Sequence, residues 1–235
     1  MPPDDYRMAA DGRVKGRPIV GVNWPVQLFD TATVVGSALV LVGGDREFAE
    51  RLISERHYTR TIPSGKSHYV RFGNAVVVWS LPANKNIGVF LVGRSVNIWE
   101  LSRLWAPDGH EPNLLTQAIS AAAKAIRHLE RPEVLVSYAD PNVGHEGCVY
   151  RAASWIYDGV SDESRVYEDT DGSRLPRRSF HSGGQGLRKA EIEALGYREL
   201  SLPGKHRYVR FLCKRAAREY VARRRTDPST YVSSR

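Results

Sequence analysis

Apolar residues along this chain fall into short runs, typical of strands, and into longer stretches with helical spacing. Strands are predicted where the short runs lie, at residues 34–42, 68–72, 75–81, 88–92, 97–105, 134–138 and 207–212. Helical spacing predicts helices at 45–55, 113–129 and 188–195, another that begins near His145, and a basic one after residue 212. A further strand around Tyr167 is expected inside the loop-rich stretch 160–185.

The order of these elements predicts an α/β fold with a mixed, largely antiparallel central sheet flanked by helices. This order is similar to that of GNAT-type acetyltransferases. In that fold the fourth strand, the next loop and its helix grip the pyrophosphate of acetyl-CoA, a task that free N–H groups suit. The loop at 107–113 lacks the RxxGxG/A pattern typical of those enzymes. We expect a catalytic domain at 35–215, between a polar arm at 1–34 and a basic C-terminal helix or tail at 216–235.

Positive charge changes the expected partner of this domain. The chain has 235 residues, a formal net charge of +8 and a sequence pI of about 9.6. Such a charge predicts a polyanionic partner, with nucleic acid as the first candidate. Positive residues are dense between Lys205 and Arg225, where Glu219 is the single acidic residue. This block predicts phosphate contacts, and the alternative is a solvated helix with a basic tail.

The cellular compartment follows from what the sequence lacks. It has no run of ~18 apolar residues that would predict a membrane span. Its first residues have no apolar core of a signal peptide. Two cysteines, Cys148 and Cys213, are too few for a disulfide framework and are expected to be small buried apolar residues. We therefore expect a cytoplasmic protein that does not bind membranes.

Candidate chemistry lies where the apolar run 134–136 ends. Ser137, Tyr138 and Asp140 follow that run, and a turn and a helix come next. Proteins of the α/β class commonly place their chemistry where a buried strand ends and feeds a helix. The alternative is an ordinary turn in which Asp140 caps the helix.

Other polar motifs have equally plain alternatives. The PSGKS turn at 63–67 is no phosphate-binding P-loop, because Arg60 stands where that motif needs glycine. His57 ends a predicted helix, where a histidine also complements the helix dipole. The cationic and aromatic run 205–209 suits DNA backbone contact and base stacking, or an edge strand protected by charge.

Alternation along the predicted strand 97–105 gives each side chain a face. It places Leu101 and Arg103 on one face and Glu100, Ser102 and Leu104 on the other. A salt bridge within the strand is the simplest explanation for its glutamate and its arginine.

Eight separated segments of the chain carry a resemblance that none carries alone. They are ERHYTR at 55–60, PSGKS at 63–67, residues 88–93, ELSRLW at 100–105, Pro112–Asn113, VSYAD at 136–140, GHEGCVYRAASWIYDG at 144–159 and GKHRYV at 204–209. Together, and in this order, they resemble the Mom family of phage DNA-modification proteins. The resemblance covers roughly residues 36–215.

The resemblance implies a GNAT-like fold, the use of acetyl-CoA, and conversion of adenine N6 in double-stranded DNA to a carbamoylmethylated amine. In phage this change protects the genome from restriction enzymes. The resemblance also implies a bound iron held by His57, Asp140 and Tyr150, whose nitrogen and oxygen donors suit iron better than a soft metal. Because adenine N6 is paired and stacked in a duplex, we expect the base to be flipped out.

These considerations assign a role to each candidate residue. The predicted catalytic residues are His57, Tyr58, Asp140 and Tyr150. Contacts to acetyl-CoA are predicted for Ser102, Arg103 and Asn113. DNA contacts are predicted for Lys66, Lys205, His206, Arg207, Arg210, Lys214 and Arg215.

Three alternatives stay open at the level of sequence. A GNAT-type acyltransferase that acts on a protein or a small amine keeps the fold and the cofactor without DNA. A non-enzymatic protein that binds DNA through its basic C-terminus predicts strongly salt-dependent binding, without iron or acetyl-CoA. A relative within the family that makes a different modified base is the third.

Overall fold

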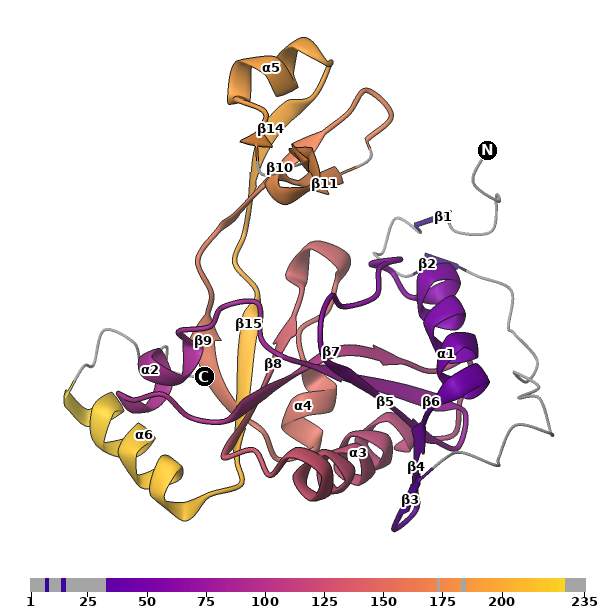
Figure 1. Ribbon diagram of the computed structural model, residues 1–235, viewed down its shortest axis with the longest axis vertical. Helices are drawn as coiled ribbons and strands as arrows, with labels where there is room; N and C mark the ends of the chain where they lie inside the picture. The colour runs from indigo at the N-terminus through magenta and orange to yellow at the C-terminus, as the bar shows by residue number, and fades with distance from the viewer. Residues whose placement is uncertain (1–6, 9–13, 16–32, 173, 183–184, 227–235) are drawn as a thin grey trace.

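One eight-stranded sheet forms the centre of the molecule (Figure 1). The computed structural model describes residues 7–8, 14–15, 33–172, 174–182 and 185–226. Across the sheet the strands are β3 (Thr33–Val35), β4 (Ala38–Leu41), β5 (Ser67–Phe72), β6 (Ala75–Ser80), β7 (Ile98–Trp105), β8 (Val134–Ala139), β15 (His206–Phe211) and β9 (Ile156–Val160). Neighbouring strands are antiparallel except for the parallel pair β7 and β8. The predicted mixed, largely antiparallel sheet is therefore confirmed.

Helices cover both faces of this sheet. The long helix α3 (Leu114–Glu130) and the short helix α4 (Cys148–Ala152) pack on one face, where the alanine-rich stripe of α3 meets Trp79, Trp99 and Leu135. On the other face lie α1 (Gly43–Arg56), α2 (Ile87–Val92) and α6 (Lys214–Thr226). The predicted flanking helices are thus present.

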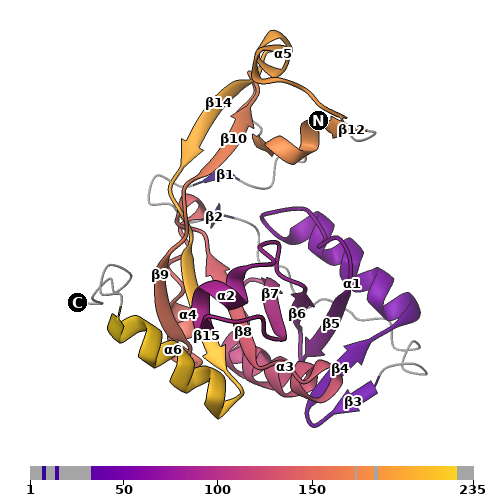
Figure 2. The ribbon, with the colours of Figure 1, turned by 60° about the vertical axis from the view of Figure 1, so that its left-hand side comes forward.

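An arm projects from one end of the sheet, between β9 and β15 (Figures 1 and 2). Its residues, 161–204, hold a second sheet of β11 (Arg174–Pro176), β10 (Ser164–Glu168) and β14 (Arg198–Leu202). It also contains η3 (Arg177–Phe180), the strand pair β12 (His181–Ser182) and β13 (Gln185–Gly186), and helix α5 (Lys189–Ala194). Tyr167 and Ile192 are fully buried in it. The arm therefore has a small core of its own, and the predicted strand around Tyr167 is confirmed.

Several predicted elements differ from the structure. The run 88–92, predicted as a strand, belongs to helix α2. Its buried residues Ile87, Gly88, Leu91 and Val92 have helical spacing, and Gly93 ends the helix with a left-handed φ of 80°. Periodicity alone does not separate a strand from a buried helix in so short an apolar run.

Two boundaries also move. The single strand predicted at 34–42 is a hairpin of β3 and β4 that turns at Gly36, whose φ is +62°. The helix predicted to begin near His145 begins three residues later, at Cys148, after the short helix η2 (Pro141–Val143). Most of the predicted N-terminal arm and residues 227–235 lie outside the described residues, except for the strand pair β1 (Arg7–Met8) and β2 (Val14–Lys15).

No helix among the residues that the structure describes is long and apolar enough to cross a membrane. The basic helix α6 packs on the sheet through Ala216 and Tyr220, both buried.

Candidate active site

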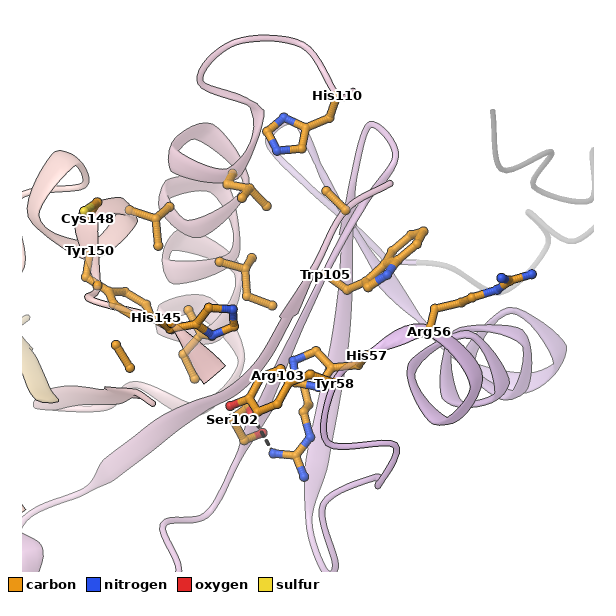
Figure 3. A pocket seen from close by; sticks show the side chains of 18 of the residues that line it. Arg56, His57, Tyr58, Ser102, Arg103, Trp105, His110, His145, Cys148 and Tyr150 are labelled. Atoms are coloured by element: carbon orange, nitrogen blue, oxygen red, sulfur yellow. Dashed lines mark hydrogen bonds between the residues drawn. The ribbon is translucent and has the colours of Figure 1, made fainter. Parts of the chain in front are cut away.

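A pocket of about 800 Å³ opens where the two parallel strands stop pairing (Figure 3). Pairing between β7 and β8 begins at Ile98 with Val134 and ends at Leu101 with Ser137. Beyond that point β7 continues to Trp105, and residues of both strands line the pocket. Ligands of α/β proteins commonly bind at such carboxyl ends, and this volume lies within the usual range of small-molecule sites, about 300–1,000 Å³.

A β-bulge shapes the β7 wall of the pocket. Val78 of β6 pairs with Arg103 and Trp79 pairs with Leu101, so that Ser102 is an extra residue between them. Ser102 donates a hydrogen bond from Oγ to the carbonyl of Val78, 3.1 Å away. The bulge makes the predicted alternation wrong beyond Leu101. Leu104 packs in the same cluster as Leu101, while Arg103 shares the other face with Glu100.

Arg103 joins two walls of the pocket. Its guanidinium donates to the carbonyl and to the hydroxyl of Thr61, both at 2.9 Å, and to the carbonyl of Ser102 at 2.6 Å. Thr61 belongs to the loop after α1 that also carries His57. Arg103 therefore lines the pocket, as does Ser102, but its described hydrogen bonds fasten this loop to the bulge.

His57 ends helix α1 and is buried, with 6% of its surface exposed. Its Nδ1 accepts the backbone N–H of Thr59 at 3.2 Å and lies 2.9 Å from the Thr59 hydroxyl. Because that nitrogen accepts, the neutral ring carries its proton on Nε2. Burial, with the nearby charges of Arg103 and His145, lowers the pKa of His57 to about 3. At neutral pH His57 is therefore an uncharged N–H donor.

Tyr58 and His145 place aromatic rings from two different loops in the pocket (Figure 3). The Tyr58 ring lies 4.4 Å from that of His57 and meets the His145 ring edge-on at 5.0 Å. Enclosure by the pocket walls, followed by the charge of Asp140, raises the pKa of Tyr58 to about 12, although 44% of its surface is exposed. Burial also lowers the pKa of His145, against the opposing effect of Asp140.

Tyr150 lines the pocket from α4 and is nearly buried, with 7% exposed. Its ring packs 5.2 Å from that of Tyr208 and 5.6 Å from that of Trp155. Burial raises its pKa to about 12, despite a hydrogen bond with Ser137 that acts in the opposite direction. The phenol therefore keeps its proton at neutral pH.

Asp140 follows β8 but is not among the residues that line the pocket. Its Oδ2 lies 2.7 Å from Nζ of Lys205, and its Oδ1 accepts from the backbone N–H and the side-chain amide of Asn142 at 3.0 and 2.9 Å. Burial acts to raise the pKa of Asp140, but Lys205 and Asn142 together outweigh it and hold that pKa below its usual value. The carboxylate is thus charged, and both of its oxygens have partners.

Whether the predicted ligands fit an iron ion depends on the hydrogen bonds and ion pairs that their donor atoms already form. His57 presents N–H at Nε2, because its Nδ1 lone pair accepts from Thr59, whereas a metal needs a free lone pair. Asp140 does not line the pocket that His57 and Tyr150 share, and both of its oxygens are already bonded. Among the described residues no group of three or more His, Cys, Asp or Glu side chains is placed to hold a metal. As arranged, the three predicted ligands do not fit an iron ion.

Asn113, the third residue predicted to contact acetyl-CoA, lies at the N-terminus of α3 with a left-handed φ of 64°. It does not line the pocket, but Leu115 of the first helical turn and residues 106–110 of the loop before it do. The helix end therefore lies at the rim of the pocket.

Strand register separates the predicted DNA-binding residues into two groups. His206 pairs with Ala139 and Phe211 pairs with Val134, so Lys205 and His206 lie at the pocket end of the sheet. Arg210 and the two residues that begin α6, Lys214 and Arg215, lie towards the other end. So does Lys66, which pairs with Glu130 near the start of β5. The predicted DNA contacts therefore lie at both ends of the sheet and do not form one patch at the pocket.

Arg207 requires a correction. Only 8% of its surface is exposed, and its Nε donates to Oδ2 of the buried Asp158 at 2.5 Å. Its guanidinium also lies over the ring of Phe90, 4.5 Å from the centroid. A side chain so enclosed has no access to a DNA phosphate, and the prediction of a DNA contact is wrong for this residue.

Sequence reasoning missed several residues of the pocket. The sequence places His145 only at the beginning of a predicted helix and indicates no role for His110, Arg56 or Arg60, yet all four residues line the pocket. Arg60 has a left-handed φ of 47°, in a turn where its N–H donates to the carbonyl of His57. The signal for His145 was its place in the turn after a carboxylate that ends a buried strand.

Fold and site together define a class: an α/β domain with one central sheet and a pocket of histidine and tyrosine side chains where two parallel strands part. The chain belongs to the Mom protein family, whose model matches residues 39–229. It is 32% identical over 184 residues to the methylcarbamoylase Mom of Escherichia phage Mu, covering 72% of this chain and 73% of that protein. A solved structure of RimL, a ribosomal L7/L12 alpha-N-protein acetyltransferase, covers 77% of this chain and 97% of its own, with 9% identity and a TM-score of 0.36.

Proposed function

We propose that this protein is a DNA-modifying enzyme that converts adenine N6 in double-stranded DNA to a carbamoylmethyl amine, with acetyl-CoA as the carbon donor. The observation that carries the proposal is the pocket between β7 and β8, found in a chain of the Mom family. The relative in phage Mu is named a methylcarbamoylase, which fits the proposed product.

The pocket suits a base that has left the helix. In a duplex the N6 amine is paired and stacked, so the enzyme takes the adenine out of the stack. Tyr58 offers an exposed ring in the pocket wall, and base–aromatic stacking contributes about 1–3 kcal/mol per base. Lys205 and His206 lie at the same end of the sheet as the opening.

The proposed product fixes the balance of the reaction. An acyl transfer would attach the carbonyl carbon to N6, whereas a carbamoylmethyl group attaches the methyl carbon. Adenine N6–H₂, the acetyl thioester and ammonia together give N6–H–CH₂–CO–NH₂, free CoA thiol, two protons and two electrons. The reaction is therefore an oxidation and requires a two-electron acceptor, which is the chemical reason to expect a redox-active metal. As arranged, the three predicted iron ligands do not fit such a metal.

Two histidines supply proton chemistry in the pocket. His57 donates from Nε2 and binds an acceptor oxygen of the acetyl group. His145 is neutral at pH 7, since burial lowers its pKa, and it takes the proton that leaves N6. Ser102 at the bulge and the N-terminus of α3 at the rim hold the thioester and the pyrophosphate of CoA.

Mass spectrometry of nucleosides tests the proposal directly. Plasmid DNA from cells that express the protein is digested, and deoxyadenosine heavier by the carbamoylmethyl increment is expected. Unmodified DNA in the presence of soluble protein contradicts the proposal and favours an acyltransferase that acts on another amine. A different added mass keeps DNA as the substrate and changes the product.

A further inference from the structure

We propose that Asp140 and Lys205 are positioning residues that fix the arm to the pocket, and that Asp140 acts through this ion pair rather than as a metal ligand. The inference rests on the proposed function, because it concerns how duplex DNA is held while a base enters the pocket.

The arm is joined to the sheet by a narrow neck. Ser161 donates its backbone N–H to the carbonyl of Lys205 at 2.9 Å, and its hydroxyl accepts the backbone N–H of Lys205 at 2.9 Å. Gly204 lies so close to Ser161 that an added Cβ would stand 1.8 Å from the Ser161 carbonyl oxygen. The two segments of the neck are therefore fixed to each other. The direction in which the arm projects depends on the contacts between these segments and the central sheet.

Both oxygens of Asp140 connect to this neck. Oδ2 pairs with Lys205 at 2.7 Å, where 12% of the aspartate side chain and 38% of the lysine side chain are exposed. Oδ1 accepts from the side-chain amide of Asn142, and that amide also donates to the carbonyl of Pro203 at 3.3 Å. One carboxylate thus holds the neck directly and through Asn142.

The backbone of Asp140 organises the pocket wall. Its carbonyl accepts the N–H of Val143 at 3.3 Å and the N–H of His145 at 3.0 Å. The side chain of Asp140 therefore holds the arm, while its main chain holds the turn that presents His145. Asp140 therefore contacts both the turn that lines the pocket and the neck of the arm.

We call the contacts of Asp140 with Lys205 and Asn142 the joint of the arm. This joint matters because the arm and the pocket lie at the same end of the sheet (Figures 1 and 2). A duplex that delivers a base to the pocket runs past the root of the arm. Loss of the ion pair frees the neck, and the arm then has to be ordered again each time DNA binds. The expected effect is a higher KM for DNA with a nearly unchanged kcat.

Three variants separate the joint from a ligand role. Asp140→Asn keeps an oxygen at Oδ1 that accepts from Asn142 but removes the negative charge. Lys205→Met removes the ammonium and keeps the apolar stem, and Lys205→Arg restores the charge. Arg46→Met is the control, because Arg46 pairs with Glu50 at 2.9 Å within helix α1 and does not line the pocket.

Steady-state modification of duplex DNA is measured together with iron content. Asp140→Asn and Lys205→Met are each expected to raise KM for DNA about tenfold, and the double variant no further, because both remove one interaction. Lys205→Arg restores KM, Arg46→Met leaves it unchanged, and iron content is the same in all variants. The proposal is overturned if Asp140→Asn abolishes kcat and lowers iron content while Lys205→Met stays as active as the wild type.

Amide hydrogen exchange keeps the two proposals apart. If the wild-type protein does not modify DNA, the proposed function fails, and the joint is still tested by exchange of the neck amides of Ser161 and Lys205. Faster exchange at these amides in Asp140→Asn and in Lys205→Met supports the joint. Exchange equal to that of the wild type contradicts it.

Discussion

Two regions of this molecule contain arginines in opposite surroundings, buried and paired in one and exposed in the other. Beneath α6 the fully buried Asp158 accepts from Arg207, Arg224 and the hydroxyl of Tyr220. At the pocket, Arg56 and Arg60 are exposed and line an open space. The first region uses guanidinium groups to attach a helix to the sheet, whereas the second leaves them facing a pocket. The net charge of a sequence depends only on how many charged side chains it has. The ion-pair partners of each cationic side chain decide whether it is available to a ligand.

The largest expected effect removes the carboxylate at the centre of the first region. Asp158→Ala leaves two enclosed guanidinium groups without their acceptor, and breaking such a buried pair costs about 3–5 kcal/mol. Urea unfolding should show this loss as a lower midpoint with an unchanged slope. Glu193→Ala is the control, because its pair with Lys189 is long, at 3.8 Å, and exposed. A loss below about 1 kcal/mol in Asp158→Ala would mean that solvent already screens these charges.

In the second region His57→Ala should affect chemistry more than folding. Loss of the Nε2 donor and of its contact with Tyr58 is expected to lower the rate of DNA modification by about 10²-fold or more, the usual effect of removing an acid–base group. Single-turnover modification of a plasmid measures it. His110→Ala is the matched control, since His110 lies at the rim and its ring nitrogen bonds to the carbonyl of Glu111. Equal losses in both variants would contradict the assigned role.

The pKa of His57 also makes stability depend on pH. Folding lowers that pKa from 6.5 to about 3, so the unfolded chain binds a proton that the folded protein rejects. The contribution is fully present above pH 6.5 and is lost as pH falls towards 3, with a slope of at most about 1.4 kcal/mol per pH unit. Urea unfolding of the wild type and of His57→Gln at pH 7.5, 5.5 and 4.5 tests this sign. Parallel curves for the two proteins would contradict it.

What the sequence predicts well is set by local pattern. The alanine-rich stripe of α3 and the buried run of β8 each have one clear period, and both were placed correctly. Of the three residues that the resemblance implies for one site, His57 and Tyr150 line the same pocket, whereas Asp140 does not.

What the sequence does not predict depends on distant partners. The bulge at Ser102 is fixed by the register of β6, which local alternation does not contain. Arg207 is buried because Asp158, 49 residues away, lies opposite it. The ion pair of Asp140 with Lys205, on a strand that returns only after the arm, is equally invisible in the local sequence. In each case the missing information is a tertiary contact.

The smallest expected effect concerns the surface of α6. Arg215 pairs with Glu219 of the same helix at 2.8 Å, and it lies at the end of the sheet away from the pocket. Arg215→Ala should change stability by no more than about 0.5 kcal/mol, the usual worth of such a pair. DNA affinity measured against salt concentration should keep its slope. A slope reduced by about one unit would show that Arg215 neutralises a phosphate. The basic helix would then belong to the DNA surface, and the duplex would extend from the pocket across the whole sheet.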